Sequence, residues 1–179
     1  WVNPTPRLYI SFEDSVLCNN ETLEIVVEDG MGIVKGGKKR YRVIANYNSS
    51  FLNIDSRPNG IPDTIDIGQS ILDTYENRIN EAVSVTYRFT PLILNDGVGY
   101  QLSCSNGVSF DTTIWINPTP LLSASIEESI VCDSAEIYIA VNDDLDYVRY
   151  ANKVYQLYPI YTTGAISGLI SDTIELAAG

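Results

Sequence analysis

Apolar and polar residues alternate along several short stretches of the chain, which is the pattern of half-buried β-strands. Six stretches are predicted to be strands: Leu8–Phe12, Leu23–Asp29, Tyr41–Asn46, Thr64–Ile67, Val83–Phe89 and Val108–Ile116. Gly68–Ala82 leaves two alternatives open, a helical turn through Ile71, Tyr75 and Ile79 or a polar loop. Short strands about every dozen residues predict an antiparallel β-sandwich.

The chain also repeats itself. The hexapeptide "WVNPTP" at Trp1 returns as "WINPTP" at Trp115, 114 positions later, and Cys18 and Cys132 are also 114 positions apart. Between these landmarks "LEIVVED" matches "IYIAVND" without a gap. Further on, "RY" recurs and "IPDTI" matches "ISDTI" at a spacing of 109. The shorter spacing predicts that five residues are lost at the Gly- and Lys-rich segment "KGGKKR", interpreted as a hairpin tip.

The repeat predicts how the chain is divided. Residues 1–6 are the end strand and linker of a preceding repeat, 7–116 a complete sandwich, 117–120 a linker, and 121–179 a truncated second repeat. Proline lacks an amide N–H and fixes φ, so Asn-Pro-Thr-Pro belongs in a stiff connector and not in a central strand. The predicted fold class is all-β, with tandem antiparallel β-sandwiches joined by Pro-containing linkers.

The amino-acid composition argues against several classes of function. The net charge of −12 argues against a nucleic-acid partner, because phosphate binding needs clustered Lys and Arg. No stretch approaches the ~20 apolar residues of a membrane span, so no membrane insertion is expected of this segment. Histidine is absent, which removes the commonest general base and metal ligand, and no cofactor is predicted. The paired carboxylates Glu13-Asp14 and Glu127-Glu128 recur at the same place in each repeat, which favours a solvated edge over a catalytic pair.

The cysteines suggest a disulfide. Cys18 has a repeat equivalent in Cys132, whereas the equivalent of Cys104 would fall beyond Gly179. This arithmetic predicts one bridge per repeat, Cys18 to Cys104, and leaves the partner of Cys132 open. The alternative is two free, buried thiols. A bridge would indicate an oxidising compartment.

Several phrases resemble one known family. "VTYRFTP" (Val85–Pro91), "C-x-x-G" (Cys104–Gly107) and "TTIWINPTP" (Thr112–Pro120) resemble the PKD-like domain that recurs in very large cell-surface proteins of Bacteroidota. The resemblance implies an Ig-like sandwich without catalytic residues, exported to the extracellular cell surface as a spacer or adhesive stalk. Arrays of this kind occur in gliding-motility adhesins that leave through the type IX secretion system. The implied partners are neighbouring repeats of the same chain.

Two kinds of site remain as hypotheses. The acidic loop Asn53–Asp66 offers oxygen ligands for Ca²⁺ from Asp55, Asn59, Asp63 and Asp66, although Arg57 occupies a ligand-like position. Asp-Ser/Thr triplets resemble the O-glycosylation acceptor of Bacteroidota, or simply begin strands. Their candidate acceptors are Ser15, Thr64, Thr112, Ser134 and Thr173.

The leading interpretation is a non-catalytic structural segment of a secreted cell-surface protein: a stalk, filament or adhesin. One alternative is a carbohydrate-binding accessory region of a secreted enzyme, with surface glycans as partners. The tyrosine run Tyr150–Tyr161 fits either sugar stacking or strand packing. Another alternative is a homopolymeric surface fibre, in which edge strands pair with other copies of the chain.

Overall fold

The computed structural model describes residues 2–95, 102–127, 130, 132, 138–158 and 172–176. These residues contain β-strands and no helix. The all-β prediction is therefore confirmed. No helix in these ranges is long and apolar enough to cross a bilayer. The strands are β1 (Leu8–Ser11), β2 (Val16–Leu17), β3 (Thr22–Asp29), β4 (Gly37–Asn46), β5 (Leu52–Ile54), β6 (Asp63–Asp66), β7 (Ile71–Asn77), β8 (Val83–Asn95), β9 (Leu102–Cys104), β10 (Phe110–Ile116), β11 (Leu122–Ile126), β12 (Ile139–Asp143), β13 (Lys153–Leu157) and β14 (Asp172–Leu176).

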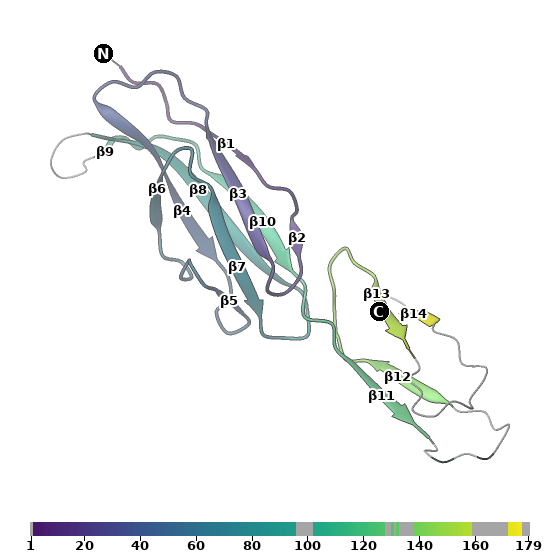
Figure 1. Ribbon diagram of the computed structural model, residues 1–179. Coiled ribbons are helices and arrows are strands. Elements are labelled where there is room, and N and C mark those ends of the chain that lie inside the picture. Colours follow the sequence, from purple (N-terminus) through teal and green to yellow (C-terminus); the bar gives the residue numbers. More distant parts are fainter. Residues whose placement is uncertain are drawn as a thin grey trace.

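The strands from β1 to β10 form a β-sandwich, called here the N-terminal sandwich (Figure 1). One sheet has the order β1-β3-β7-β5 and the other the order β2-β10-β8-β4-β6, with β9 paired to β8. All pairs are antiparallel except β2 with β10. The predicted strand Leu8–Phe12 corresponds to β1, and the short β2 that follows it joins the other sheet.

The core lies between the two sheets and follows the predicted alternation. In β3 the side chains of Leu23, Ile25 and Val27 are buried, while Glu24 and Glu28 are exposed. Other fully buried side chains come from β4, β7, β8 and β10: Tyr41, Val43, Tyr75, Val85, Tyr87, Phe89, Ile114 and Ile116. Burial of this apolar surface is the main force that holds the two sheets together.

Four strands of the sandwich were not predicted: β2, β5, β7 and β9, of which β7 is the longest. Gly68–Ala82 contains β7, so both the helical turn and the polar loop are wrong for Ile71–Asn77. The inward-facing residues of β7 are Ile71, Asp73, Tyr75 and Asn77, and all four are buried. Because two of the four are polar, the alternation of apolar and polar residues is interrupted, and the period of two is hidden.

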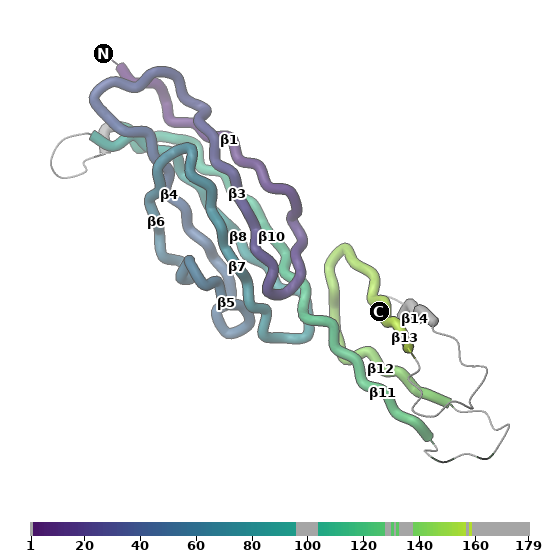
Figure 2. The backbone as a smooth tube through the Cα atoms, viewed as in Figure 1, coloured from purple at the N-terminus to yellow at the C-terminus, as the bar shows by residue number. Residues whose placement is uncertain are grey.

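Beyond the sandwich, β11 pairs with β12 and β13 with β14. The register Leu122↔Asp143 repeats Leu8↔Asp29 of β1 and β3, 114 residues earlier. Two-stranded pairs of this size bury little, and all of β11 is exposed. Figure 2 shows the backbone of β11 and β12 continuing past the end of the sandwich.

The change in spacing lies elsewhere than predicted. Tyr41 of β4 pairs with Ile65, and Tyr155 of β13 pairs with Ile174. β13 therefore keeps the spacing of 114 from β4, and the five residues are lost between β13 and β14. The segment "KGGKKR" is no hairpin tip, because β3 and β4 lie in different sheets and β4 already begins at Gly37.

The predicted disulfide is absent: all three cysteines are free thiols. Cys18 directly follows β2, which pairs with β10 at Ile116, beside Val83 at the start of β8. Cys104 pairs with Ile93, near the other end of β8. At about 3.3 Å per residue the two cysteines are separated by roughly 30 Å, and a disulfide needs Cα atoms within about 7 Å.

Candidate functional site

The N-terminal sandwich contacts the loop between β12 and β13 at a joint that begins with Asn117 of the second hexapeptide. The Asn117 side-chain amide donates to the Arg149 carbonyl oxygen at 3.1 Å, and the Arg149 backbone N–H donates to the Asn117 side-chain oxygen at 2.7 Å. We call this two-bond arrangement the Asn clamp. Asn117 is 8% exposed, so both of its bonds are shielded from water.

A second contact of the joint is made by backbone alone. The Asp146 N–H donates to the Asn80 carbonyl at 2.9 Å, and the Ala82 N–H donates to the Tyr147 carbonyl at 2.7 Å. Glu81 and Tyr147 thereby form a parallel β-bridge. The segment between β7 and β8 therefore docks on the β12–β13 loop as one strand docks on another.

Trp115 supplies the third contact. The Arg149 guanidinium lies 4.4 Å from the centre of the Trp115 ring and 4.6 Å from that of Tyr150. It also donates to the Tyr147 hydroxyl at 3.3 Å, and this interaction raises the pKa of Arg149. A cation held over an indole ring is a favourable arrangement, because the ring face is electronegative.

The Asn clamp occurs again at the first hexapeptide. The Asn3 side-chain amide donates to the Lys35 carbonyl at 3.0 Å, and the Lys35 N–H donates to the Asn3 side-chain oxygen at 3.0 Å. Asn3 and Asn117 are 114 positions apart, as are Lys35 and Arg149. An Asn side chain carries both a donor and an acceptor, so it can pair with both polar groups of one backbone residue.

Each Asn clamp binds a loop, and the same internal hydrogen bonds brace both loops. In the second joint loop (Asp143–Lys153) the Lys153 ammonium donates to the Asp143 carboxylate at 2.6 Å and to the Leu145 carbonyl at 2.9 Å. The Leu145 N–H donates to Asp143 at 3.0 Å, and the Lys153 hydrogen bond lowers the pKa of that carboxyl group. In the first joint loop (Asp29–Lys39) the same three contacts join Asp29, Met31 and Lys39.

The loops also share an unusual backbone residue. Gly36 has a φ of 64°, and Tyr150, 114 positions later, has a φ of 46°. Residues with a side chain seldom adopt this left-handed conformation. Its retention at Tyr150 shows that the braced loop dictates the backbone there.

Gly107 packs against Pro6, the last residue of the first hexapeptide. A Cβ at Gly107 would lie 2.4 Å from the Pro91 carbonyl oxygen and 3.1 Å from Cβ of Pro6. Pro6 is itself buried. Only glycine allows this close approach, which gives a physical reason for the glycine of the predicted C-x-x-G phrase.

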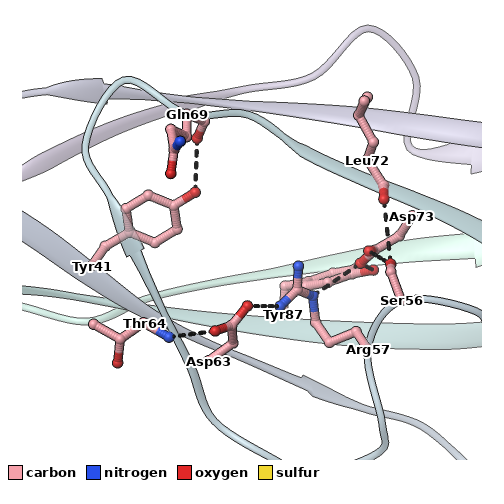
Figure 3. A network of polar contacts seen from close by, with 9 residues as sticks. All are labelled: Tyr41, Ser56, Arg57, Asp63, Thr64, Gln69, Leu72, Asp73 and Tyr87. Carbon is pink, nitrogen blue, oxygen red and sulfur yellow. Dashed lines mark hydrogen bonds and ion pairs between the residues drawn. The ribbon is translucent and has the colours of Figure 1, made fainter.

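A separate network of polar side chains lies inside the sandwich, centred on Asp73 of β7 (Figure 3). Its carboxylate accepts hydrogen bonds from Arg57 Nε at 3.1 Å, from the Tyr87 hydroxyl at 2.6 Å and from Ser56. Arg57 also donates to Asp63 at 3.1 Å. Asp73 is fully buried and Arg57 is 6% exposed, so the network fastens the β5–β6 loop to both sheets.

Burial and charge set the protonation of this network. Burial alone would lower the pKa of Arg57, but the Asp73 and Asp63 carboxylates outweigh it and raise the pKa. Burial raises the pKa of Tyr41 to about 12, and it raises the pKa values of Tyr75 and Tyr87 as well. These tyrosines are therefore neutral hydrogen-bonding groups that stay protonated at physiological pH.

The four calcium candidates do not meet at one point. Asp63 is engaged by Arg57, Asp66 forms an ion pair with Arg40 at 2.7 Å, and Asn59 accepts from the Tyr47 N–H at 2.9 Å. Asp55 is exposed. In the part of the chain that the structure describes, no three His, Cys, Asp or Glu side chains cluster closely enough to hold a metal ion.

The other candidate residues differ in exposure, and the structure describes only some of them. Ser15 and Thr64 are exposed and Thr112 is half-buried, whereas Ser134 lies outside the described residues, as does the side chain of Thr173 in β14. Of the carboxylate pairs, Glu13 and Asp14 line an open groove together with Glu21 and Glu24. Glu127 is exposed, and Glu128 falls outside the described ranges.

The sequence interpretation missed the joint and the network. Asn3 and Asn117 were treated only as parts of a linker, although their identical spacing from Lys35 and Arg149 was visible in the repeat. Placing the five-residue loss too early hid this match. The sequence did not indicate a role for Asp73 of β7, because its partner Arg57 lies in another part of the chain, between β5 and β6.

Comparison with known proteins yields one weak structural similarity. No protein-family model matches the chain, that of the PKD-like domain included, and no curated protein matches it. Among solved structures, the chain is similar to a cohesin module of a family 33 glycoside hydrolase from Clostridium perfringens. The TM-score is 0.40 at 10% sequence identity, over 64% of this chain and 100% of that one. A likeness at this level carries no argument about function.

Proposed function

We propose that this chain is a non-catalytic, load-bearing segment of an exported cell-surface repeat protein, in which sandwiches are joined end to end. The observation that carries the proposal is the Asn clamp, made twice at a spacing of 114 with donor–acceptor distances of 3.0 and 3.0 Å, and of 3.1 and 2.7 Å. A linker that only tethered two domains would need no such repeated bonding.

The joint is built to transmit force and orientation. A flexible Gly- and Ser-rich linker would let neighbouring sandwiches rotate freely, whereas two prolines and a clamped Asn restrict three of the four residues of Asn117–Pro120. The backbone bridge between Ala82 and Tyr147 adds a second point of attachment away from the linker. Two separated points fix an orientation that one point leaves free.

Small-angle X-ray scattering of the full chain tests this role. We expect an elongated particle whose maximum dimension is unchanged in Asn80→Ala, because the bond there uses the backbone carbonyl of residue 80. Asn117→Ala should broaden the distribution of distances, because the clamp is lost. Equal flexibility in the wild-type chain and in Asn117→Ala would contradict a load-bearing joint.

Export, gliding motility and O-glycosylation follow from the PKD-like resemblance and form part of the same proposal. The exposed hydroxyls of Ser15 and Thr64 suit surface modification. Protease shaving of intact cells should release fragments of this chain, and the intact mass of the released material should exceed the sequence mass if sugars are attached. A fragment found only after lysis would refute surface display.

A glycan-binding role is the second candidate, and one hollow favours it. Beside the joint, Tyr47, Phe51 and Trp115 line a depression with Asn46 and Asn48, a mixture of aromatic faces and amide groups that suits sugars. Phe51 is 40% exposed. Glycan-array binding that is lost in Phe51→Ala would support this role, and an array without signal would exclude it.

A further inference from the structure

Two apolar side chains are exposed at the end of the N-terminal sandwich that carries the first joint loop. Val2 is 93% exposed and Ile33 is 79% exposed. Their equivalents 114 positions later are Ile116, which is completely buried, and Tyr147, which is 42% exposed. The same two positions of the repeat are thus more covered at the second joint than at the first.

The backbone shows the same contrast. At the second joint the Asp146 N–H and the Tyr147 carbonyl bond to the segment between β7 and β8. Their equivalents are the Gly32 N–H and the Ile33 carbonyl, for which the described part of the chain provides no hydrogen-bond partner. A Cβ at Gly32 would meet nothing within 4 Å. An exposed donor and acceptor beside an apolar side chain are the features of an edge that accepts another strand.

We propose that the first joint loop is the docking surface for another sandwich of the same kind, whose last strand ends in Trp1 and Val2. This inference rests on the proposed function and names the partner of the joint. The docked sandwich presents its counterparts of Asn80 and Ala82 to Gly32 and Ile33. It also takes Val2 into its core, as the N-terminal sandwich takes Ile116.

The Asn3 clamp identifies the occupant as a like sandwich. Asn3 already holds Lys35 in the geometry with which Asn117 holds Arg149. The backbone leaving the docked sandwich therefore reaches the loop in the same way at both joints. With the Asn clamp and the bridge both repeated, each step of the array has the same orientation.

The first experiment uses the chain as it is, with amide hydrogen exchange at the second joint. The Asp146 amide should be protected and the Gly32 amide should exchange at least about tenfold faster, since one hydrogen bond separates them. Asn117→Ala should speed exchange at Asp146. Asn59→Ala serves as a control, because the Asn59 side chain also holds a backbone amide, that of Tyr47, but bonds neither the connector nor the loop.

The second experiment adds the proposed occupant. A further copy of residues 7–114 is placed directly before Trp1, so that Trp1 and Val2 complete its last strand. Exchange at Gly32 should slow at least about tenfold, and Ile33→Asp in the lengthened chain should reverse much of that effect. The Gly60 amide, which bonds to Ala45 near the opposite end of β4 from the first joint loop, should stay unchanged.

The outcomes separate the docking from the function. If the lengthened chain grows by one sandwich in small-angle scattering while Gly32 exchanges as before, the array stands and the docking surface is wrong. If the added copy folds back instead of extending the particle, the proposed end-to-end function fails. Slower exchange at Gly32 that appears only at high concentration of the original chain would assign the surface to a second molecule, and would overturn docking within one chain.

Discussion

The N-terminal sandwich and the strands from β11 to β14 share their backbone plan and differ in burial. Ile25 of β3 is completely buried, whereas Ile139, its equivalent in β12, is 41% exposed. The register, the braced joint loop and the left-handed residue are nevertheless the same in both. The described residues after β12 contain no counterparts of β7, β8 and β10, which cover β3 and β4 in the sandwich.

The difference separates two kinds of stabilisation. The joint loop is held by Asp, Lys and backbone groups within ten residues of one another, so it forms in either setting. Burial of the inward face requires a second sheet that comes from distant sequence. The loop is therefore a local unit, and the core is not.

Breaking the buried Arg57–Asp73 ion pair should have the largest effect, because it destabilises the sandwich core and leaves the joint loop unchanged. Asp73→Asn removes the buried counter-ion of Arg57 and leaves only the exposed Asp63, and we expect a loss of about 3 kcal/mol in the free energy of unfolding of the sandwich. Urea denaturation followed by Trp115 fluorescence measures it.

Asp111→Asn is the matched control, because Asp111 forms an exposed ion pair with Arg88 at 2.7 Å. It should change stability little. Equal effects of the two substitutions would show that the buried pair does not hold the sandwich. Exchange at Leu145 should be the same in both variants.

High pH should destabilise the sandwich next most strongly. Folding raises the pKa of Tyr41 from 10.0 to about 12, so the unfolded chain loses this proton first. The contribution of Tyr41 should be constant below pH 10 and should be lost between pH 10 and 12, which lowers stability by about 2–3 kcal/mol. Urea midpoints across this range measure the loss, and Tyr41→Phe should flatten the slope. A midpoint that is independent of pH would contradict the burial of these hydroxyls.

Adding a methyl group at Gly107, where the chain packs closely against Pro91 and Pro6, should lower the free energy of unfolding somewhat less. Gly107→Ala places a methyl group against the Pro91 carbonyl and Pro6, and we expect a loss of about 1–3 kcal/mol from overpacking. Thermal unfolding measures it. Gly32→Ala is the control, because a Cβ at Gly32 meets nothing within 4 Å. Equal melting temperatures of the two variants would show that the contact of Gly107 with Pro91 and Pro6 is not tight.

The loop brace should give the smallest effect, and it compares the two regions directly. The Lys153 side chain is 7% exposed and that of Lys39 is 25% exposed. Lys153→Met should speed exchange at Leu145 roughly tenfold, because a shielded hydrogen bond from a charged group is lost. Lys39→Met should speed exchange at Met31 less. The reverse order would mean that exposure does not govern the strength of the brace.

The sequence interpretation succeeded where neighbouring residues carry the signal. Leu23–Asp29 and Val83–Phe89 were found as strands because apolar side chains occupy every second position. It failed at β7, since Asp73 and Asn77 face inward as polar residues with partners elsewhere in the chain. It also paired Cys18 with Cys104 by counting, which gives no information about which end of a long strand each residue occupies.

The sequence alone determined the period of the strands, the repeat of 114 and the stiffness of the Pro-containing connectors, because each depends on residues close together or on simple self-comparison. The tertiary structure decided which sheet each strand joins, that Arg57 and Asp73 meet inside the core, and that Asn117 grips Arg149. Those contacts join residues 16 and 32 positions apart. Their energies depend on burial and geometry that exist only once the two sheets have packed.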